Sequence, residues 1–214
     1  MEDSACAIAG ITPLRGDAIA IDVESPAGFD AQPGQFVKLT FDVDGEAVSR
    51  FYTISSPDVT DTFELTIELD PDGEVSPLLE ALEPGDELVV SGPFGRDFYE
   101  GEPRVVILAG GPGIGPAVGI AERALADGGD AAVVYLDDDP LYEARLTAIE
   151  SDGAFVSILG PDGDFDAAVA AAIDDGAVDP QLFIYGFADF IDRATSAVGR
   201  AGGEADAAKI ENFG

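Results

Sequence analysis

The chain contains no histidine and only one cysteine, Cys6, among its 214 residues. These two scarcities exclude an internal disulfide, a cysteine-ligated iron–sulfur cluster, a zinc site built from cysteine and histidine, and a nucleophile activated by histidine. We therefore expect no metal in the site, and we interpret Cys6 as an ordinary strand residue. Any iron–sulfur centre that works with this chain must lie on a partner.

Lysine is also scarce, since Lys38 and Lys209 are the only two. Ten basic residues face 43 acidic ones, and the net charge is -33. The acidic residues are scattered along a chain of ordinary apolar content, 46%, so a core can form. Such a surface resembles that of proteins from salt-loving cells, where salt screens the self-repulsion. It argues against binding to nucleic acid or to an anionic membrane, because both require a basic surface.

Long hydrophobic runs are absent, and no stretch is apolar for long enough to cross a bilayer. The first residues, Met1-Glu2-Asp3, are acidic and lack the pattern of a signal peptide. The sequence therefore predicts a cytoplasmic protein without membrane insertion.

The first hundred residues alternate short apolar runs with turn residues. The run at 62–69 places Phe63, Leu65, Ile67 and Leu69 on one face, as in a half-buried strand. A short helix is expected at 76–82, where Ser76 is a good N-cap. Strands this short and this closely spaced indicate a barrel or a sandwich. The strands are predicted at 7–12, 18–24, 35–41, 50–55, 62–69 and 87–91.

After residue 101 the pattern changes to continuous apolar runs that alternate with helical periodicity. Strands buried on both faces and separated by helices indicate a parallel, doubly wound α/β sheet. We thus predict two domains, 1–100 and 101–214, joined by a linker at 99–103. The expected strands are 104–109, 131–136, 155–159, 181–185 and 208–213, and the expected helices are 114–125, 141–149, 165–173 and 188–200.

The segment Arg50-Phe51-Tyr52-Thr53-Ile54-Ser55-Ser56 carries a cation, a flat ring and three hydroxyls on one extended run. Alternation sends Arg50, Tyr52 and Ile54 to one side and Phe51 and Thr53 to the other. A guanidinium can clamp a phosphate, and a phenol ring can lie against a flat heterocycle. The segment fits a dinucleotide cofactor, although a barrel strand with a surface arginine would look the same.

Three further segments lie where a sheet of this kind would meet a nucleotide. Gly110-Gly111-Pro112-Gly113 follows the first buried strand and opens a helix, as a turn beside a pyrophosphate does. Asp137 follows the second, where a carboxylate can accept from a ribose 2′-hydroxyl and repel a 2′-phosphate. Tyr185-Gly186-Phe187 closes the fourth. Each is also compatible with a simple turn or a solvated loop.

Taken together, these segments resemble those of the ferredoxin–NAD(P)H reductase superfamily of flavoproteins. The resemblance covers nearly the whole chain. Its six motifs are Pro33-Gly34-Gln35-Phe36-Val37, Arg50-Phe51-Tyr52-Thr53, Gly73-Glu74-Val75-Ser76, Gly92-Pro93-Phe94-Gly95, Gly110-Gly111-Pro112-Gly113-Ile114-Gly115-Pro116 and Glu211-Asn212-Phe213.

The resemblance implies an antiparallel, Greek-key, flavin-binding β-barrel followed by a nicotinamide nucleotide-binding α/β domain. In that scheme Arg50 holds a flavin phosphate, while Tyr52 and Thr53 lie against the flavin ring and are the residues closest to catalysis. Phe213 lies near the flavin from the C-terminal side. The remaining residues expected to bind cofactor are Ser55, Ile67, Leu69, Gly73, Val75 and Ser76 for the flavin, and Gly110, Gly111, Gly113, Ile114, Asp137, Gly186 and Phe187 for the nicotinamide nucleotide.

The activity that the resemblance implies is a flavin-dependent oxidoreductase. A hydride passes from NAD(P)H to FAD, and electrons then pass to an acceptor such as a ferredoxin or an iron–sulfur or oxygenase partner. FAD is chosen over FMN because 73–76 offers a second phosphate site, and Asp137 favours NADH over NADPH.

The chain departs from the family pattern at Pro112, Gly115 and Tyr185, where the family usually has two threonines and a cysteine. These departures leave two alternatives open. One is a flavin-bearing electron-transfer subunit that does not use free NAD(P)H, and the other is a cofactor-free interaction protein that keeps only the fold.

Overall fold

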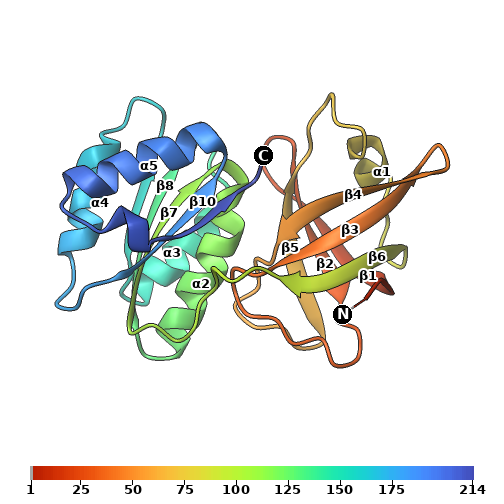
Figure 1. The fold of residues 1–214 in the computed structure, drawn as a ribbon, viewed down its shortest axis with the longest axis horizontal. Helices are drawn as coiled ribbons and strands as arrows, with labels where there is room; N and C mark the ends of the chain where they lie inside the picture. The colour runs from red at the N-terminus through yellow and green to blue at the C-terminus, as the bar shows by residue number, and fades with distance from the viewer. Residues whose placement is uncertain (1) are drawn as a thin grey trace.

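The computed structural model describes residues 2–214, and its first half is a six-stranded antiparallel sheet (Figure 1). The strand order is β4-β3-β6-β1-β2-β5, and a bridge between Ile54 and Leu65 joins the two ends of this order into a barrel. The predicted barrel is confirmed. Its elements are β1 (Ser4–Pro13), β2 (Ala18–Glu24), β3 (Phe36–Val43), β4 (Glu46–Thr53), β5 (Thr62–Glu68), α1 (Ser76–Glu80) and β6 (Glu87–Phe94).

Every second side chain of the barrel strands points inward, and these apolar side chains fill the barrel. Val37, Leu39 and Phe41 of β3 point inward, and Phe63, Leu65 and Ile67 of β5 meet them from the other side. Burial of these side chains is the main favourable term for the barrel.

Several boundaries in the barrel differ from those predicted: β1 begins at Ser4 and not at residue 7, and β6 continues to Phe94 and not to residue 91. Strand β4 begins at Glu46, not at residue 50, because Asp44 and Gly45 form a tight hairpin turn with φ of 54° and 88°. Ser76 is the first residue of α1, and Val75 occupies the N-cap without a side-chain hydrogen bond, so the prediction of a Ser76 N-cap was wrong.

The second half is a five-stranded parallel sheet of order β11-β10-β7-β8-β9. Helices α2 and α3 pack on one face of this sheet, and helices α4 and α5 pack on the other (Figure 1). This arrangement confirms the predicted doubly wound α/β fold. Its elements are β7 (Arg104–Gly110), η1 (Gly111–Gly113), α2 (Ile114–Ala126), β8 (Asp130–Leu136), α3 (Glu143–Ser151), β9 (Phe155–Leu159), α4 (Phe165–Asp174), β10 (Gln181–Gly186), α5 (Ala188–Arg200), η2 (Ala205–Ala207) and β11 (Lys209–Asn212).

Helix α3 begins at Glu143 and not at residue 141. Tyr142 precedes it in the left-handed region, with φ of 53°, so the helix cannot extend back through this residue.

The two halves lie side by side, and the C-terminus lies beside the region between them (Figure 1). The barrel's last strand ends at Phe94 and the parallel sheet begins at Arg104, so the predicted domain boundary at residue 100 falls in the connection. Within residues 2–214, none of the helices has the length and apolar character needed to cross a membrane.

Candidate cofactor-binding site

A pocket of about 130 Å³ opens at the seam between the barrel and the parallel sheet. It lies beside the carboxyl ends of β7 and β10, the edge at which open α/β sheets bind ligands. Of the residues predicted to bind cofactor, it brings together Tyr52, Thr53, Ile67, Phe187 and Phe213. Its full lining is Phe51, Tyr52, Thr53, Thr66, Ile67 and Glu68 from the barrel, and Pro112, Pro116, Phe187 and Phe213 from the second half.

Strand β4 supplies one wall, and its pairing with β3 sets the direction of each side chain. Tyr52 lies opposite Val37 and packs partly against the barrel core, and burial raises the pKa of its phenol to about 12. The phenol is therefore neutral at physiological pH. Phe51 points the other way and is 61% exposed.

Arg50 does not line the pocket; it precedes the lining residue Phe51 on β4, with much of its side chain in solvent. Its guanidinium donates to the Ser49 carbonyl at 2.9 Å and reaches the Glu74 carboxylate only at 3.6 Å. A weak, exposed pair of this kind holds the cation loosely. Arg50 therefore retains donors for an anion.

Thr53 is buried, and its hydroxyl donates to Glu211 Oε1 at 3.0 Å. Burial raises the pKa of Glu211 to about 7, Asp97 acts in the same direction, and the Thr53 hydrogen bond opposes both. Sequence reasoning missed Glu211, although it stands in the Glu211-Asn212-Phe213 motif that was interpreted only for Phe213. The structure thus places a carboxyl that titrates near neutrality against a predicted catalytic hydroxyl.

Two aromatic rings form the opposite wall. Phe187 and Phe213 meet edge to face, with ring centroids 6.1 Å apart, and Phe187 is 48% exposed. The Phe213 amide donates to the Gly186 carbonyl at 3.1 Å, which fixes the C-terminal segment against the end of β10. Gly186 therefore acts as a support for this wall.

The glycine-rich turn is shaped as much by packing as by any ligand. A Cβ at Gly113 would lie 2.7 Å from the backbone carbonyl carbon of Tyr185, and one at Gly110 would overlap the ring of Phe190. Gly111 has a positive φ of 54°, which a larger residue adopts only under strain. Ile114 is fully buried in the core beneath α2 and does not face the pocket.

A second pocket, of about 110 Å³, adjoins the first and shares Glu68 and Pro112 with it. Asp137 lines it, accepting from the Tyr135 hydroxyl at 3.0 Å and from the Asp139 amide at 2.9 Å. Burial raises the pKa of Glu68, with further contributions from the negative charges of Asp137 and Asp17. The remaining lining residues are Arg15, Gly16, Asp17, Ala18, Gly111, Asp139 and Leu141.

Besides Arg50, Gly110, Gly113, Ile114 and Gly186, five further predicted cofactor residues line neither pocket: Ser55, Leu69, Gly73, Val75 and Ser76. Ser55 is fully buried at the seam, 2.7 Å from the Thr66 hydroxyl. Val75 belongs to the barrel core, and Leu69 packs against it. Gly73 lies in the turn before α1, where its amide donates to the Asp70 carbonyl at 2.8 Å and a Cβ would lie 2.8 Å from the Ser76 hydroxyl.

The departures from the family pattern have physical causes in this chain. A Cβ at Gly115 would overlap the hydroxyls of Ser55 and Thr66, so no threonine fits there. Tyr185 is fully buried, and its hydroxyl donates to the Asp97 carbonyl at 3.1 Å. Its phenol thus fastens β10 to the segment that connects the two halves.

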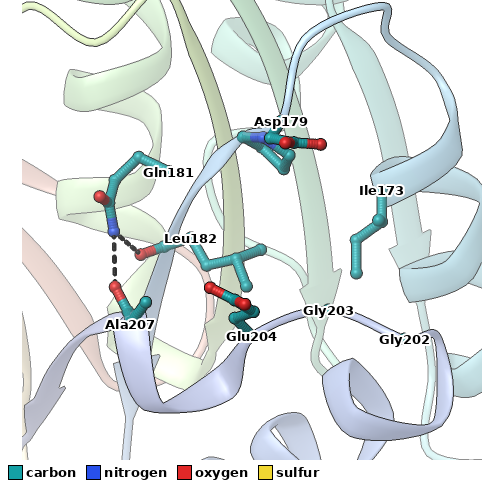
Figure 2. A pocket seen from close by; sticks show the side chains of 9 residues that line it. Ile173, Asp179, Gln181, Leu182, Gly202, Gly203, Glu204 and Ala207 are labelled. Carbon is teal, nitrogen blue, oxygen red and sulfur yellow. Dashed lines mark hydrogen bonds between the residues drawn. The ribbon is translucent and has the colours of Figure 1, made fainter.

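A cavity of about 380 Å³ lies at the opposite, amino-terminal edge of β10 (Figure 2). Ile173 and Leu182 form its apolar side, and the carboxylates of Asp179 and Glu204 stand at its rim. Gln181 turns its amide to the carbonyls of Leu182 and Ala207, at 3.0 Å each (Figure 2). None of the predicted site residues lines this cavity.

Part of the chain matches a known family and curated proteins. Residues 18–99 match the model of the oxidoreductase FAD-binding domain family. Over 99 residues the chain is 48% identical to the glycine betaine monooxygenase reductase subunit of Chromohalobacter salexigens, a match covering 44% of this chain and 26% of that protein. Over 94 residues it is 43% identical to the flavodoxin/ferredoxin–NADP reductase of Escherichia coli K12, covering 42% and 38%. The chain therefore spans well under two thirds of either relative.

Solved structures extend the likeness to the whole fold. The structure of the ferredoxin reductase in carbazole 1,9a-dioxygenase superposes on this chain with a TM-score of 0.83 and 20% identity. The match covers 100% of this chain and 70% of the reductase chain. The FAD/NAD-binding domain of the nitric oxide dioxygenase of Vibrio cholerae matches over 100% of both chains, with a TM-score of 0.81 and 16% identity. At these identities the likeness establishes the fold.

Proposed function

Because this chain belongs to the ferredoxin reductase-like superfamily of FAD- and nicotinamide-binding oxidoreductases, we propose that it is an NAD(P)H-dependent flavoprotein reductase. It takes a hydride from the nicotinamide nucleotide onto FAD and passes electrons to a separate acceptor. The observation that carries this proposal is the seam pocket, which joins Tyr52 and Thr53 of the barrel to Phe187 and Phe213 of the second half.

The residues of the barrel fit a flavin. Tyr52 offers a neutral phenol ring, Thr53 a buried hydroxyl, and Arg50, two residues before Tyr52 on β4, a loosely paired guanidinium for a phosphate. We assign the second phosphate, and hence FAD over FMN, to the segment with Gly73, Val75 and Ser76, where α1 begins. When bound, the flavin supplies the hydride and electron chemistry.

We assign the nicotinamide nucleotide to the adjoining pocket. We assign the pyrophosphate to the turn at Gly110, Gly111 and Gly113, and the adenosine ribose to Asp137. The neighbouring carboxylates of Glu68 and Asp139 favour NADH, because a 2′-phosphate would add two negative charges beside them.

The chain's own side chains orient the Thr53 hydroxyl and exclude water from the pocket. Glu211 holds the Thr53 hydroxyl in one direction, and Phe213 and Phe187 keep water from the wall facing Tyr52. No histidine is available for proton transfer, so binding and positioning are the protein's main contribution.

The acceptor that we propose is an oxygenase component, ferredoxin or flavodoxin, the classes that the relatives' names contain. An exposed aromatic group beside the pocket suits such a partner. Phe36 contacts Phe51 and Phe94 with ring centroids 5.7 and 5.9 Å apart, and Phe51 also lines the pocket. We further propose that the protein works in the cytoplasm of a salt-loving cell, on the basis of its acidic surface.

A second candidate is an electron-transfer subunit that does not use free NAD(P)H. The carboxylates that line the nucleotide pocket favour it, because a dinucleotide carries negative phosphates.

The deciding experiment is an absorbance spectrum of the protein as isolated, followed by anaerobic stopped-flow mixing with NADH and then NADPH in concentrated salt. Bleaching of the flavin band by NADH supports the reductase. A flavin that stays oxidised with both nucleotides supports the electron-transfer subunit, and a colourless protein that takes up no FAD contradicts both.

A further inference from the structure

A partly buried guanidinium, that of Arg145, crosses the seam between the two halves. Arg145 belongs to α3, and its side chain is 23% exposed. It donates to both oxygens of Glu122 on α2, at 2.8 and 2.7 Å, and to Glu64 of β5 at 2.9 Å. A fourth hydrogen bond reaches the Ser55 carbonyl at 3.0 Å. Two of its four hydrogen bonds therefore end in the barrel, and the other two end on Glu122 of α2 in the second half.

Tyr142 adds to these contacts between the two halves, which we call the joint, from a strained backbone conformation. Its left-handed backbone, with φ of 53°, is strained for a residue with a bulky side chain. In that conformation its hydroxyl donates to Glu64 Oε1 at 3.1 Å and lies 2.8 Å from the Thr66 hydroxyl. The Arg145 guanidinium covers its ring at 4.9 Å. The strain is therefore accompanied by contacts that cross the seam.

Helix α2 approaches the barrel with no space for a side chain. A Cβ at Gly119 would lie 2.6 Å from the Ser55 carbonyl oxygen, and one at Gly115 would overlap the Ser55 and Thr66 hydroxyls. Backbone meets backbone here, so the two halves cannot slide together any further.

The joint is continuous with the cofactor pocket. Thr66, which contacts Tyr142, also lines the pocket, and Pro116 lines it from α2 directly after Gly115. A shift along the seam would therefore change the separation of the two pocket walls, and with it the approach of a hydride donor to its acceptor.

Other ion pairs that cross the seam are exposed. Arg15 pairs with Glu143 at 3.2 Å, and Arg123 pairs with Asp58 at 2.6 Å, with side chains largely in solvent on at least one partner. Concentrated salt screens such pairs, whereas partly buried pairs such as those of Arg145 are screened less.

We propose that Arg145 is a positioning residue for hydride transfer, which fixes the nucleotide-binding half against the flavin-binding barrel in a way that salt does not weaken. The proposal rests on the proposed function. Arginine is required because its planar fork makes several directed hydrogen bonds at once, which a lysine ammonium cannot reproduce.

The first test is Arg145→Lys, with Arg123→Lys as the matched control at the same seam. In about 2 M KCl, where exposed pairs are screened, we expect Arg145→Lys to lower the limiting rate of flavin reduction at saturating NADH by about tenfold or more. The dissociation constants for FAD and NADH should stay within about twofold, because neither ligand contacts Arg145 in this scheme. Arg123→Lys should reduce flavin at close to the wild-type rate.

Hydrogen–deuterium exchange supplies a readout that needs no cofactor. Exchange at residues 54–56 and 115–119 should rise in Arg145→Lys and not in Arg123→Lys. If neither nucleotide reduces the wild-type flavin, the proposed function fails, and an unchanged exchange pattern would overturn the joint independently. A wild-type reduction rate in Arg145→Lys overturns the positioning role even where exchange rises.

Two further variants cover the case in which Arg145→Lys does not fold. Tyr142→Phe removes only the hydroxyl, and Gly119→Ala places a methyl group against the Ser55 carbonyl while leaving Arg145 intact. A reduction rate lowered about threefold or more in either variant, with unchanged FAD affinity, supports the proposal. Wild-type rates in both overturn it.

Discussion

At the scale of single residues, the site combines groups whose charge is fixed with one whose charge changes near neutral pH. Arg50 is a permanent cation and Tyr52 a neutral phenol, whereas the raised pKa of Glu211, about 7, lets its carboxyl hold a proton in weakly acidic solution. The electrostatic character of the wall around Thr53 therefore depends on pH.

Glu211 makes stability depend on pH in a defined direction. Between its ordinary pKa of 4.5 and about 7, the folded carboxyl keeps a proton that the unfolded one has released. The free energy of unfolding must therefore fall as pH rises through this window. We expect the free energy of unfolding of Glu211→Gln, relative to that of the wild type, to increase by about 2 kcal/mol from pH 5 to pH 8. Urea unfolding of both proteins at the two pH values measures this difference. A gain that does not change with pH would contradict the burial of this carboxyl.

Arg50 is expected to contribute affinity for flavin. Arg50→Gln removes a charge-assisted hydrogen bond to a phosphate, which is worth about 1.5–3 kcal/mol, so the dissociation constant for FAD should rise about 10- to 100-fold. Lys38→Gln is the control, since Lys38 lies on the neighbouring strand but pairs with Asp3 at 3.3 Å. Fluorescence titration of the apoprotein in high salt gives both constants. Equal weakening by the two changes would indicate a general charge effect.

At the scale of elements, local patterns in the sequence were sufficient to predict most strands and helices. The alternating pattern of β5 and the apolar run of β7 can each be read from consecutive residues. The glycines between β7 and α2 likewise predict the turn at Gly111. The predicted start of β4 was wrong because the Asp44-Gly45 turn was not recognised. The predicted start of α3 was wrong because no local sequence pattern indicates a left-handed backbone at Tyr142.

The site could be predicted only in part, for a related reason. Tyr52, Phe187 and Phe213 were found through motifs, and they meet in one pocket. Glu211 and Arg145 were missed because their roles depend on partners far away in the chain, Thr53 for the first and Glu64 for the second. Conversely, Ser55 lies in a predicted motif but faces α2, since the backbone has already turned into the seam.

The glycine-rich turn yields a prediction at this scale. In Gly113→Ala the new methyl group would overlap the Tyr185 backbone, so the turn must move away from β10. We expect the affinity for NADH to fall about tenfold, while the flavin spectrum and FAD affinity stay as in the wild type. Gly160→Ala, where the methyl group meets only open space, is the matched control. NADH affinity unchanged in Gly113→Ala would remove this turn from the nucleotide site.

At the scale of the whole molecule, charge dominates. With a net charge of -33, the folded state concentrates mutual repulsion that the unfolded chain relieves by expansion. Most of the cations already pair with carboxylates, including Arg145, Arg200 and Lys209, so they offer little further compensation.

We expect the melting temperature to rise by roughly 10 °C between about 0.1 M and 2 M KCl, as the Debye length falls from about 10 Å to below 3 Å. Differential scanning calorimetry measures this, with sorbitol at matched osmolality as the control for water activity. A melting temperature that rises equally in sorbitol would assign the effect to solvent exclusion and not to screening.

The burial of Cys6 inside the barrel has a chemical consequence for a protein of this kind. Reduced flavins in air generate hydrogen peroxide, and sulfur atoms are the side-chain atoms that peroxide attacks most readily. Apart from Cys6, the sole sulfur belongs to Met1, and the position where the family usually has a thiol is filled by Tyr185. In the proposed flavoprotein, peroxide formed at the seam would therefore meet no sulfur atom among the side chains that line the pocket.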